Sequence, residues 1–324
     1  MKIKEEFEKL FGNTLEPKEA RAFLVGLYEK GESYEDIATA ASVMREHSIK
    51  LPISEALQSQ AIDVVGTGGD KSGSFNISTT VSLLLSSLGS VVAKHGNRSI
   101  TSNSGSADVL EALGINLDLT PTQQISMLEE TGFCFIFAMN HHPAMKHIMP
   151  IRKSIEHRTI FNILGPLSSP AGAKKYLLGV FSPEYIERMA KALLELKASR
   201  AFVVSSNDGM DEISLASTTE FAYLDGGILS YGTIDPQSFG FQKATKEEIM
   251  GGDAIQNAQI TRDIFAGVAT KAQRDIVLIN AGFALFADGK TRDIQEAFEM
   301  VREALASGRA AAHLQKIAKL SNAL

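Results

Sequence analysis

The chain has little cysteine, no tryptophan and no long hydrophobic run. Its single cysteine, Cys134, cannot form an internal disulfide, so we expect a reducing, cytoplasmic compartment and a small buried side chain in the apolar run FCFIF. The longest apolar stretch, residues 276–287, is too short to span a membrane and is typical of a buried helix. The charged residues 1–12 lack the apolar centre of a signal peptide, so no membrane partner is expected.

The chain also lacks an excess of positive charge. Lys and Arg number 32 against 38 Asp and Glu, and the resulting net charge of −6 argues against nucleic acid as a partner. Hydrophobic residues make up 44% and charged residues 22%, which is ordinary for a globular protein. A length of 324 residues is enough for two domains with buried cores that need no disulfide.

The spacing of apolar residues changes near residue 60. Residues 1–60 carry apolar side chains at helical intervals, with Ser33 as an expected N-cap, and favour a small helical domain. From residue 61 to 324, short apolar strands alternate with helices, which predicts an α/β domain with a mainly parallel central sheet flanked by helices. A hairpin is expected at 221–236. The other expected strands are 61–65, 90–94, 133–138, 174–181 and 199–206.

A glycine-rich loop follows the first expected strand and leads into a helix. DVVGTGGDKSGSFNIST, residues 63–79, can turn backbone amides toward a phosphate at the helix N-terminus. It is not a dinucleotide-binding fingerprint, because Lys71 occupies the sixth position, and not a Walker loop, because Asp70 precedes Lys71-Ser72. A phosphate site and a plain tight turn both remain open from this loop alone.

Two more loops extend the case for a phosphate site. KHGNRSITSNSGS, residues 94–106, combines cations, amides and hydroxyls that suit phosphate oxygens, and it follows the next expected strand. The loop at 205–214 carries adjacent carboxylates, Asp211 and Glu212, of the kind that hold Mg²⁺ beside a phosphate. Loops at the carboxyl ends of strands in an open α/β sheet meet at one crevice. An acidic pair alone would be ordinary surface charge.

The stretch at 141–158 is basic within an acidic chain. Arg152 is a candidate for binding a carboxylate, with solvated surface charge as the alternative. The histidines of this stretch do not have zinc-site spacing and are expected to pack or lie on helix surfaces: His141, His142, His147 and His157.

Seven segments in order resemble the anthranilate phosphoribosyltransferase family: GTGGD, SFNIST, KHGNRS, GSADVLEALG, HPAMKH, RTIFNILGPL and the pair DE at 211–212. The resemblance covers nearly the whole chain. It implies a small helical domain, joined in space by helices from about 142–165, and a larger α/β domain. It also implies transfer of phosphoribosyl from phosphoribosyl pyrophosphate (PRPP) to anthranilate, with Mg²⁺ as two ions and a homodimer formed through the helical domains.

The resemblance assigns residues to three roles. Magnesium ligands would be Ser78, Asp211 and Glu212. Anthranilate would meet Gly66, Asn97 and Arg152, with His95 and His142 lining its path. PRPP would contact Gly66, Gly69, Asp70, Ser74, Asn76, Ile77, Ser78, Thr79, Lys94, His95, Gly96, Asn97, Arg98, Ser99, Ile100, Thr101, Ser102 and Ser106.

The expected reaction is displacement of pyrophosphate at the ribose C1 by the aryl amine. No protein nucleophile or general base is assigned, so catalysis is expected through positioning and charge stabilisation. Some relatives dock onto a glutamine amidotransferase subunit of anthranilate synthase, which is a further candidate partner. Three alternatives stay open: a nucleoside phosphorylase of related fold, a nucleic-acid-binding relative, and an inactive anion-binding scaffold.

Overall fold

The N-terminal residues form a group of helices. The computed structural model describes residues 2–99 and 103–324. The Ser33 side chain accepts a hydrogen bond from the Asp36 amide, and the Asp36 carboxylate accepts one from the Ser33 amide, so Ser33 is the N-cap that the sequence predicts. The helical interpretation of residues 1–60 is confirmed by α1 (Lys2–Phe11), α2 (Pro17–Lys30), α3 (Tyr34–Glu46) and α4 (Glu55–Gln60).

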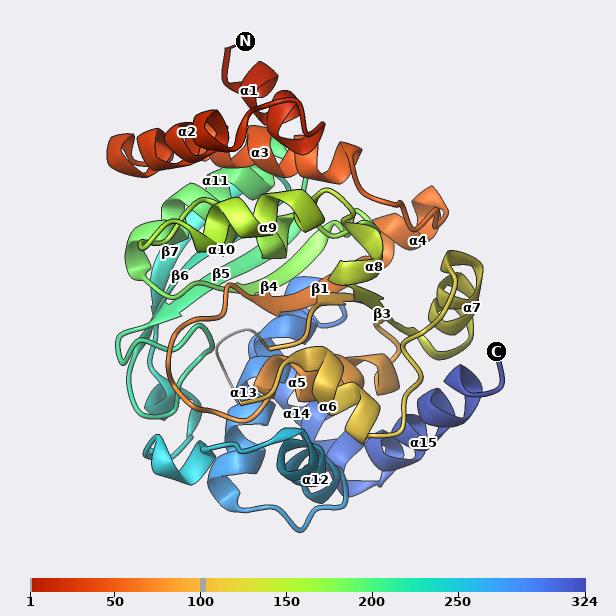
Figure 1. Ribbon diagram of the computed structural model, residues 1–324. Coiled ribbons are helices and arrows are strands. Elements are labelled where there is room, and N and C mark those ends of the chain that lie inside the picture. The colour runs from red at the N-terminus through yellow and green to blue at the C-terminus, as the bar shows by residue number, and fades with distance from the viewer. Residues whose placement is uncertain (1, 100–102) are drawn as a thin grey trace.

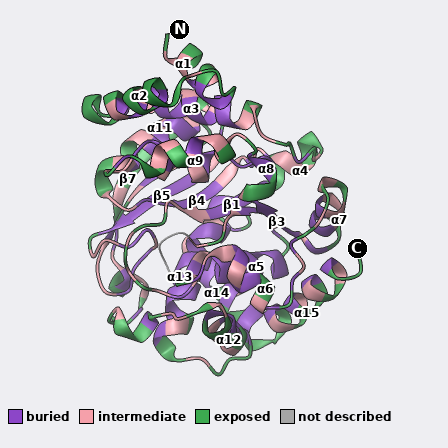
Figure 2. Cartoon of the chain, viewed as in Figure 1, coloured by how far each residue is buried: buried purple, intermediate pink, exposed green. Residues whose placement is uncertain are grey.

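A seven-stranded sheet in the order β3-β2-β1-β4-β5-β6-β7 forms the centre of the molecule. β1 to β5 run parallel, and β6 and β7 add an antiparallel edge, so the expected mainly parallel sheet is confirmed. Figure 2 shows the parallel strands as buried, as expected for strands covered on both faces. The strands are β1 (Ala61–Gly66), β2 (Val91–Gly96), β3 (Phe133–Phe137), β4 (Lys175–Gly179), β5 (Arg200–Ser206), β6 (Thr219–Asp225) and β7 (Ile228–Ile234).

The antiparallel edge is the hairpin expected at 221–236. Gly226 and Gly227 connect β6 to β7 with φ angles of 55° and 90°. Both central residues of this two-residue turn therefore have positive φ, which glycine adopts without steric cost and which matches the twist of paired strands. β3 ends one residue before the expected strand end, because Ala138 begins the next helix.

Helices cover the sheet on both sides (Figure 1). α13 packs against α5, β4 and β5 and is buried along most of its length, which confirms the buried helix expected at 276–287. The remaining helices of this part are α5 (Ile77–Ser87), α6 (Ser106–Ala112), α7 (Pro121–Thr131), α11 (Ile186–Glu195), α12 (Ala254–Phe265), α13 (Lys271–Asp288), α14 (Ile294–Ala306) and α15 (Arg309–Ser321). Single turns of 3₁₀ helix lie at Gly165–Leu167, Pro183–Tyr185, Pro236–Phe239 and Glu247–Ile249.

The segment after β3 returns to the N-terminal helices. It forms α8 (Ala138–His141), α9 (Met145–Lys153) and α10 (Phe161–Leu164). α9 packs against α1 and α2, and α10 packs against α3. Figure 1 shows α9 and α10 on the same side of the sheet as these N-terminal helices. The His147 ring hydrogen-bonds the Leu10 carbonyl oxygen at 3.0 Å. These contacts support the expected grouping of 142–165 with the helical part, and the division into two domains stays a prediction.

The strand order places the carboxyl ends of β1 and β4 side by side at a point where the chain changes direction across the sheet. From β1 the chain continues to β2 and β3 on one side, and from β4 it continues to β5 on the other. A switch point of this kind is where open α/β sheets bind ligands. Among the helices of the described ranges, none combines the length and apolar character needed to cross a bilayer.

Candidate functional site

The loop between β1 and α5 is an open loop with several left-handed residues. Gly68, Gly69, Lys71 and Gly73 all have positive φ, between 58° and 72°. Loops with such conformations direct backbone amides into a concavity that suits an anion. The loop lies between the end of β1 and the N-terminus of α5, where helix amides add to the same effect. These observations favour the phosphate interpretation over a plain tight turn.

The loop after β5 folds onto the carboxyl ends of β1 and β4. The last residue of each of these two strands must be glycine, Gly66 in β1 and Gly179 in β4. A Cβ atom on Gly66 would lie 2.3 Å from Asp211 Oδ2, and one on Gly179 would lie 1.5 Å from the Asp211 carbonyl oxygen. Either substitution would displace Asp211. The two glycines therefore permit the close approach that brings the acidic loop to the switch point.

The acidic pair contacts backbone amides of the glycine-rich loop and α5. Asp211 Oδ2 accepts a hydrogen bond from the Gly68 amide at 2.7 Å. Glu212 Oε1 accepts one from the Ser78 amide in the first turn of α5 at 3.2 Å. Although 143 and 134 residues separate the partners, the fold brings together the expected metal residues and the expected phosphate loop.

The electrostatics of this acidic pair suit a divalent cation. Burial and the nearby charge of Asp70 raise the pKa of Asp211 to about 7. Burial and the charge of Asp211 raise the pKa of Glu212 well above its ordinary value, with Lys94 opposing them. Crowded, buried carboxylates of like charge gain stability from a cation between them.

Within residues 2–99 and 103–324, no three His, Cys, Asp or Glu side chains form a metal site by themselves. Proteins usually hold Mg²⁺ through one or two carboxylates while substrate oxygens and water complete the shell. The donor set of Ser78, Asp211 and Glu212 therefore fits Mg²⁺ that arrives with a phosphate ligand.

The Lys94 side chain lies against the first turn of α5 rather than in the loop that follows β2. Its Nζ atom donates to the Val64 carbonyl oxygen at 2.7 Å and to Ser78 Oγ at 3.5 Å, and its side chain is buried. Burial lowers the pKa of Lys94, while the charges of Asp63 and Glu212 raise it. The amine is thus next to an expected magnesium ligand, and its expected contact with PRPP stays a prediction.

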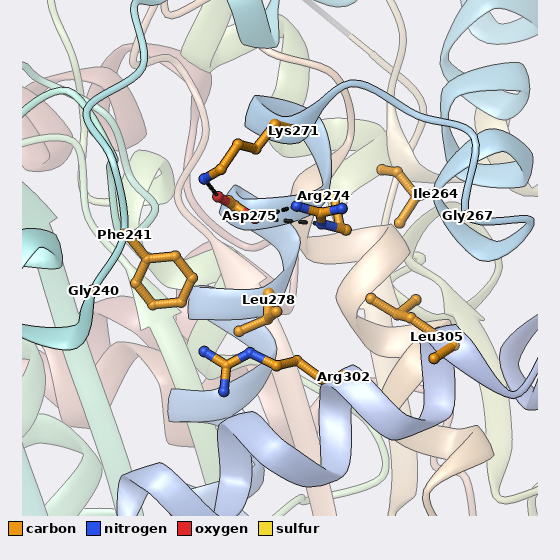
Figure 3. A pocket seen from close by; sticks show the side chains of 11 residues that line it. Gly240, Phe241, Ile264, Gly267, Lys271, Arg274, Asp275, Leu278, Arg302 and Leu305 are labelled. Atoms are coloured by element: carbon orange, nitrogen blue, oxygen red, sulfur yellow. Dashed lines mark hydrogen bonds and ion pairs between the residues drawn. The ribbon is translucent and has the colours of Figure 1, made fainter.

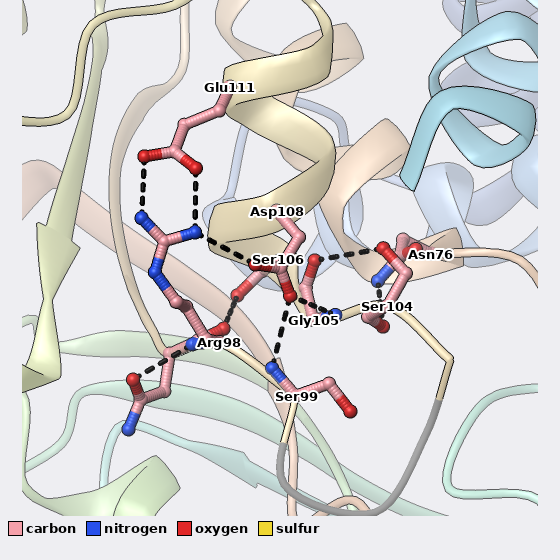
Figure 4. A network of polar contacts seen from close by, with 9 residues as sticks. Asn76, Arg98, Ser99, Ser104, Gly105, Ser106, Asp108 and Glu111 are labelled. Carbon is pink, nitrogen blue, oxygen red and sulfur yellow. Dashed lines mark hydrogen bonds and ion pairs between the residues drawn. The ribbon is translucent and has the colours of Figure 1, made fainter. Parts of the chain in front are cut away.

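The loop between β2 and α6 is held by a polar network (Figure 4). The Asp108 carboxylate accepts hydrogen bonds from the Ser99 amide at 3.1 Å and the Gly105 amide at 2.9 Å. Ser106 Oγ donates to the Asn97 carbonyl oxygen at 3.2 Å, which closes the loop at its base. Three of the expected PRPP residues, Ile100, Thr101 and Ser102, lie outside the described residues.

Arg98 points to α6 in this network. Its guanidinium makes two hydrogen bonds with the Glu111 carboxylate, at 2.6 and 2.7 Å, and a third with Asp108 at 2.9 Å (Figure 4). The resemblance implied a contact between Arg98 and PRPP. The structure instead shows the guanidinium engaged by carboxylates of α6, so any phosphate contact would have to compete with these pairs.

Asn76 joins the two phosphate-type loops. Its Nδ2 donates to the Ser104 carbonyl oxygen at 3.2 Å, and its Oδ1 accepts from Asn257 Nδ2 at 2.8 Å. Ile77 and Thr79 are buried at the start of α5, so their side chains belong to the core. A contact of Ile77 with a ligand would therefore come from the backbone, whereas the buried Thr79 Oγ1 has no hydrogen-bond partner in the described residues.

The two histidines expected on the anthranilate path lie against each other. His142 Nε2 is 3.2 Å from His95 Nε2, and His95 Nδ1 is 3.1 Å from the Gly165 carbonyl oxygen. Burial lowers the pKa of His142 to about 4 and that of His95 well below its ordinary value, so both rings are neutral near neutral pH. With Nδ1 donating to Gly165, His95 Nε2 must accept from His142 Nε2–H.

Arg152 is a partly buried cation on α9. Burial lowers the pKa of its guanidinium, and no other cause contributes. In the part of the chain that the structure describes, the guanidinium has no hydrogen-bond or ion-pair partner. A partly buried guanidinium that has no protein partner is suited to bind a carboxylate, which favours that interpretation over solvated surface charge.

Two residues of the same region were not singled out from the sequence. Arg158 donates to the Gly69 carbonyl oxygen at 2.8 Å, and its guanidinium carbon stacks 3.5 Å from the centre of the Phe181 ring. Asp63, fully buried in β1, accepts hydrogen bonds from the His95 amide at 3.3 and 3.4 Å. A charged residue inside the apolar strand AIDVV was the signal that could have identified Asp63.

A cavity of about 490 Å³ lies elsewhere, among α12, α13 and α14 (Figure 3). None of the residues expected at the site lines it. Asp275 pairs with both Lys271 and Arg274 there, so its one carboxylate is already shared between two cations. The acidic pair, Arg152 and the loops after β1 and β2 therefore remain the stronger candidate site.

The fold and the site together indicate the class of the protein, a transferase with an α/β domain. Residues 58–311 match the glycosyl transferase family, a/b domain. A protein from Xanthobacter autotrophicus named anthranilate phosphoribosyltransferase is 44% identical over 320 residues, which are 98% of this chain and 91% of that protein.

Two solved structures are similar to the chain. Anthranilate phosphoribosyltransferase from Thermus thermophilus has a TM-score of 0.92 and 39% identity, over 99% of this chain and 94% of that one. The enzyme of the same name from Saccharomyces cerevisiae, in complex with PRPP and Mg, has a TM-score of 0.87 and 27% identity, over 95% of this chain and 86% of that one. The chain belongs to the anthranilate phosphoribosyltransferase family.

Proposed function

We propose that the chain transfers the 5-phosphoribosyl group of PRPP to the amine of anthranilate, giving N-(5-phosphoribosyl)anthranilate and pyrophosphate, in tryptophan biosynthesis. The observation that carries the proposal is the acidic pair, Asp211 and Glu212, hydrogen-bonded to the amides of Gly68 and Ser78 at the switch point of the sheet. These contacts support a magnesium site beside a phosphate-binding loop. Membership of the family supports the same reaction.

The PRPP half of the site consists of the loops after β1 and β2. Amides of the glycine-rich loop and of the first turn of α5 would hold phosphate oxygens, and the network through Asn76 and Asp108 would keep the two loops in register. The individual contacts assigned to residues 66–79, 94–102 and 106 are part of this proposal.

Ser78, Asp211 and Glu212 would hold Mg²⁺, as two ions, together with PRPP. The metal supplies neutralisation of the negative charge that develops on the departing pyrophosphate. The chain positions the two carboxylates, because the Gly68 and Ser78 amides donate hydrogen bonds to their oxygens. The yeast relative, solved in complex with PRPP and Mg, supports the use of magnesium together with PRPP.

The anthranilate half would lie toward the returning helices. Arg152 would bind the substrate carboxylate, while Gly66, Asn97 and the neutral rings of His95 and His142 would line its path. The amine nitrogen forms a bond to the ribose C1 as the bond from C1 to the pyrophosphate oxygen breaks, and the amine then loses a proton. Alignment of the two bound substrates and stabilisation of the developing charge would supply the rate enhancement.

The assembly and location are also proposals. We propose that the chain acts in the cytoplasm as a homodimer joined through its helical domain. In this division, residues 1–60 form the helical domain, joined in space by helices from about 142–165, and residues 61–324 form the α/β domain. A glutamine amidotransferase subunit of anthranilate synthase is a further proposed partner. Family membership supports these proposals, and contacts of α9 and α10 with α1, α2 and α3 support the helical grouping.

A product assay tests the proposed reaction against a nucleoside phosphorylase. The purified chain is incubated with anthranilate, PRPP and Mg²⁺, and in parallel with a nucleoside and phosphate. We expect pyrophosphate and N-(5-phosphoribosyl)anthranilate in equal amounts in the first mixture and no free base in the second. Phosphorolysis of the nucleoside without reaction of PRPP would refute the proposal.

A further inference from the structure

The side chain of Asn280, in the middle of α13, forms hydrogen bonds with the loop that carries the acidic pair. Asn280 is fully buried. Its Oδ1 accepts a hydrogen bond from the Ile213 amide at 2.9 Å, and its Nδ2 donates to the Ile213 carbonyl oxygen at 2.8 Å. Nδ2 also donates to the Ile276 carbonyl oxygen at 2.9 Å, which fixes the orientation of the amide. Two bonds to one residue restrain both the position and the rotation of the loop.

The opposite side of the loop is attached to the ends of β5 and β6. Ser206 Oγ donates to the Glu212 carbonyl oxygen at 2.6 Å and accepts from the Ser214 amide at 3.1 Å. Thr219 Oγ1 also accepts from the Ser214 amide, at 3.2 Å. The acidic pair therefore lies between an attachment to the sheet and an attachment to α13, and Asn280 supplies the second.

The packing of α13 does not explain an amide at this position. Its neighbours Ile279 and Ala281 are fully buried, and the helix lies against the sheet and α5. A polar side chain at such a position costs free energy unless it is hydrogen-bonded, and an apolar residue of similar size would pack there. The hydrogen-bonding capacity of Asn280 is instead directed largely at Ile213, the residue next to Glu212.

We propose that Asn280 is a positioning residue for the magnesium site. By fixing Ile213, it holds the carboxylates of Asp211 and Glu212 against the amides of Gly68 and Ser78. The inference rests on the proposed function, because the placement of the carboxylates affects PRPP through the cation they share. Groups that orient metal ligands commonly alter metal affinity by about 10- to 100-fold when they are removed.

Calorimetric titration of PRPP tests this role without requiring turnover. PRPP affinity is measured in saturating Mg²⁺ and again in EDTA, and the ratio of the two gives the Mg²⁺-dependent gain. Asn280→Leu keeps the side-chain size and removes the three hydrogen bonds. We expect it to reduce the gain by about tenfold while the affinity in EDTA stays unchanged. Asn280→Asp, which retains an acceptor for the Ile213 amide, shows the same loss if Asn280→Leu does not fold.

Thr261→Val is the matched control. Thr261 Oγ1 lies 2.8 Å from Thr80 Oγ1 in a buried contact between α12 and α5, so the variant also loses a buried hydrogen bond but leaves the acidic loop alone. It should keep the full Mg²⁺-dependent gain. Folded Asn280 variants that keep the gain, or that lose PRPP affinity equally in Mg²⁺ and EDTA, would overturn the inference. Absence of any gain in the unsubstituted chain would refute the proposed function itself.

Discussion

At the scale of single residues, two arginines of the candidate site differ in whether the described residues already pair with their charge. Arg98 is paired with Glu111 and Asp108, whereas Arg152 is partly buried without a partner in the described parts of the chain. A desolvated guanidinium gains most from an incoming carboxylate. The acceptor substrate should therefore depend on Arg152 more than on Arg98.

Arg152→Ala should raise the KM for anthranilate by about tenfold to 100-fold, because a charge-assisted hydrogen bond contributes about 1.5–3 kcal/mol. The KM for PRPP should change by less than about threefold, since the guanidinium makes no contact with the phosphate-type loops in the described parts of the chain. Initial-rate kinetics with each substrate varied in turn measure both constants. Equal increases in the two KM values would remove Arg152 from its assigned role.

At the scale of elements, the loop between β2 and α6 is held by a polar network with two parts, a half-buried carboxylate and an exposed ion pair. Asp108 accepts hydrogen bonds from two loop amides, those of Ser99 and Gly105. Glu111 contacts the loop through the exposed Arg98 side chain. Loss of an acceptor for backbone amides alters loop geometry, whereas an exposed ion pair contributes little.

Asp108→Ala should therefore raise the KM for PRPP by about tenfold, corresponding to about 1.4 kcal/mol lost from two backbone hydrogen bonds. Glu111→Ala provides the comparison on the same helix and should change that constant by less than about threefold. Steady-state kinetics and the midpoint of thermal unfolding are measured for both. A larger effect from Glu111→Ala would show that the pair with Arg98, not the amide contacts, orders the loop.

The sequence predicted the elements better than the contacts between them. Ser33 capping, the glycine turn at 226–227 and the buried helix at 276–287 follow from local pattern, and each was confirmed. The contact of Asn280 with Ile213 spans 67 residues, and nothing in the run VLINAG indicates which loop the amide meets. The pairing of Arg98 with α6 also depends on the path of the loop, which spacing does not determine. The expected contact of Arg98 with PRPP stays a prediction.

At the scale of the whole molecule, buried histidines connect the site to stability. The folded chain holds His142 neutral because burial, with the charges of His141 and Lys50, lowers its pKa to about 4, against 6.5 for an ordinary histidine. The unfolded chain therefore binds a proton that the folded chain excludes between these two values. The contribution of neutral His142 to the free energy of unfolding is therefore fully present above pH 6.5 and is lost as the pH falls toward 4.

Unfolding in urea at about pH 7 and about pH 5 should reveal this dependence, since each unit of pKa difference corresponds to about 1.36 kcal/mol. In His142→Gln, the decrease in unfolding free energy between the two conditions should be smaller by about 2 kcal/mol than in the unsubstituted chain. An unchanged decrease would mean that the folded protein accommodates a protonated His142.

The central claim, that the switch point of the sheet binds PRPP through magnesium for transfer to anthranilate, is tested most directly by anthranilate fluorescence. The chain is mixed with anthranilate, PRPP and Mg²⁺, with EDTA added or PRPP omitted in the controls. Fluorescence should decline only in the complete mixture. The rate should fall by at least about 100-fold in the double variant Asp211→Asn, Glu212→Gln, because both carboxylates proposed to hold the metal are lost. A decline that persists in EDTA or in the folded double variant would contradict the account.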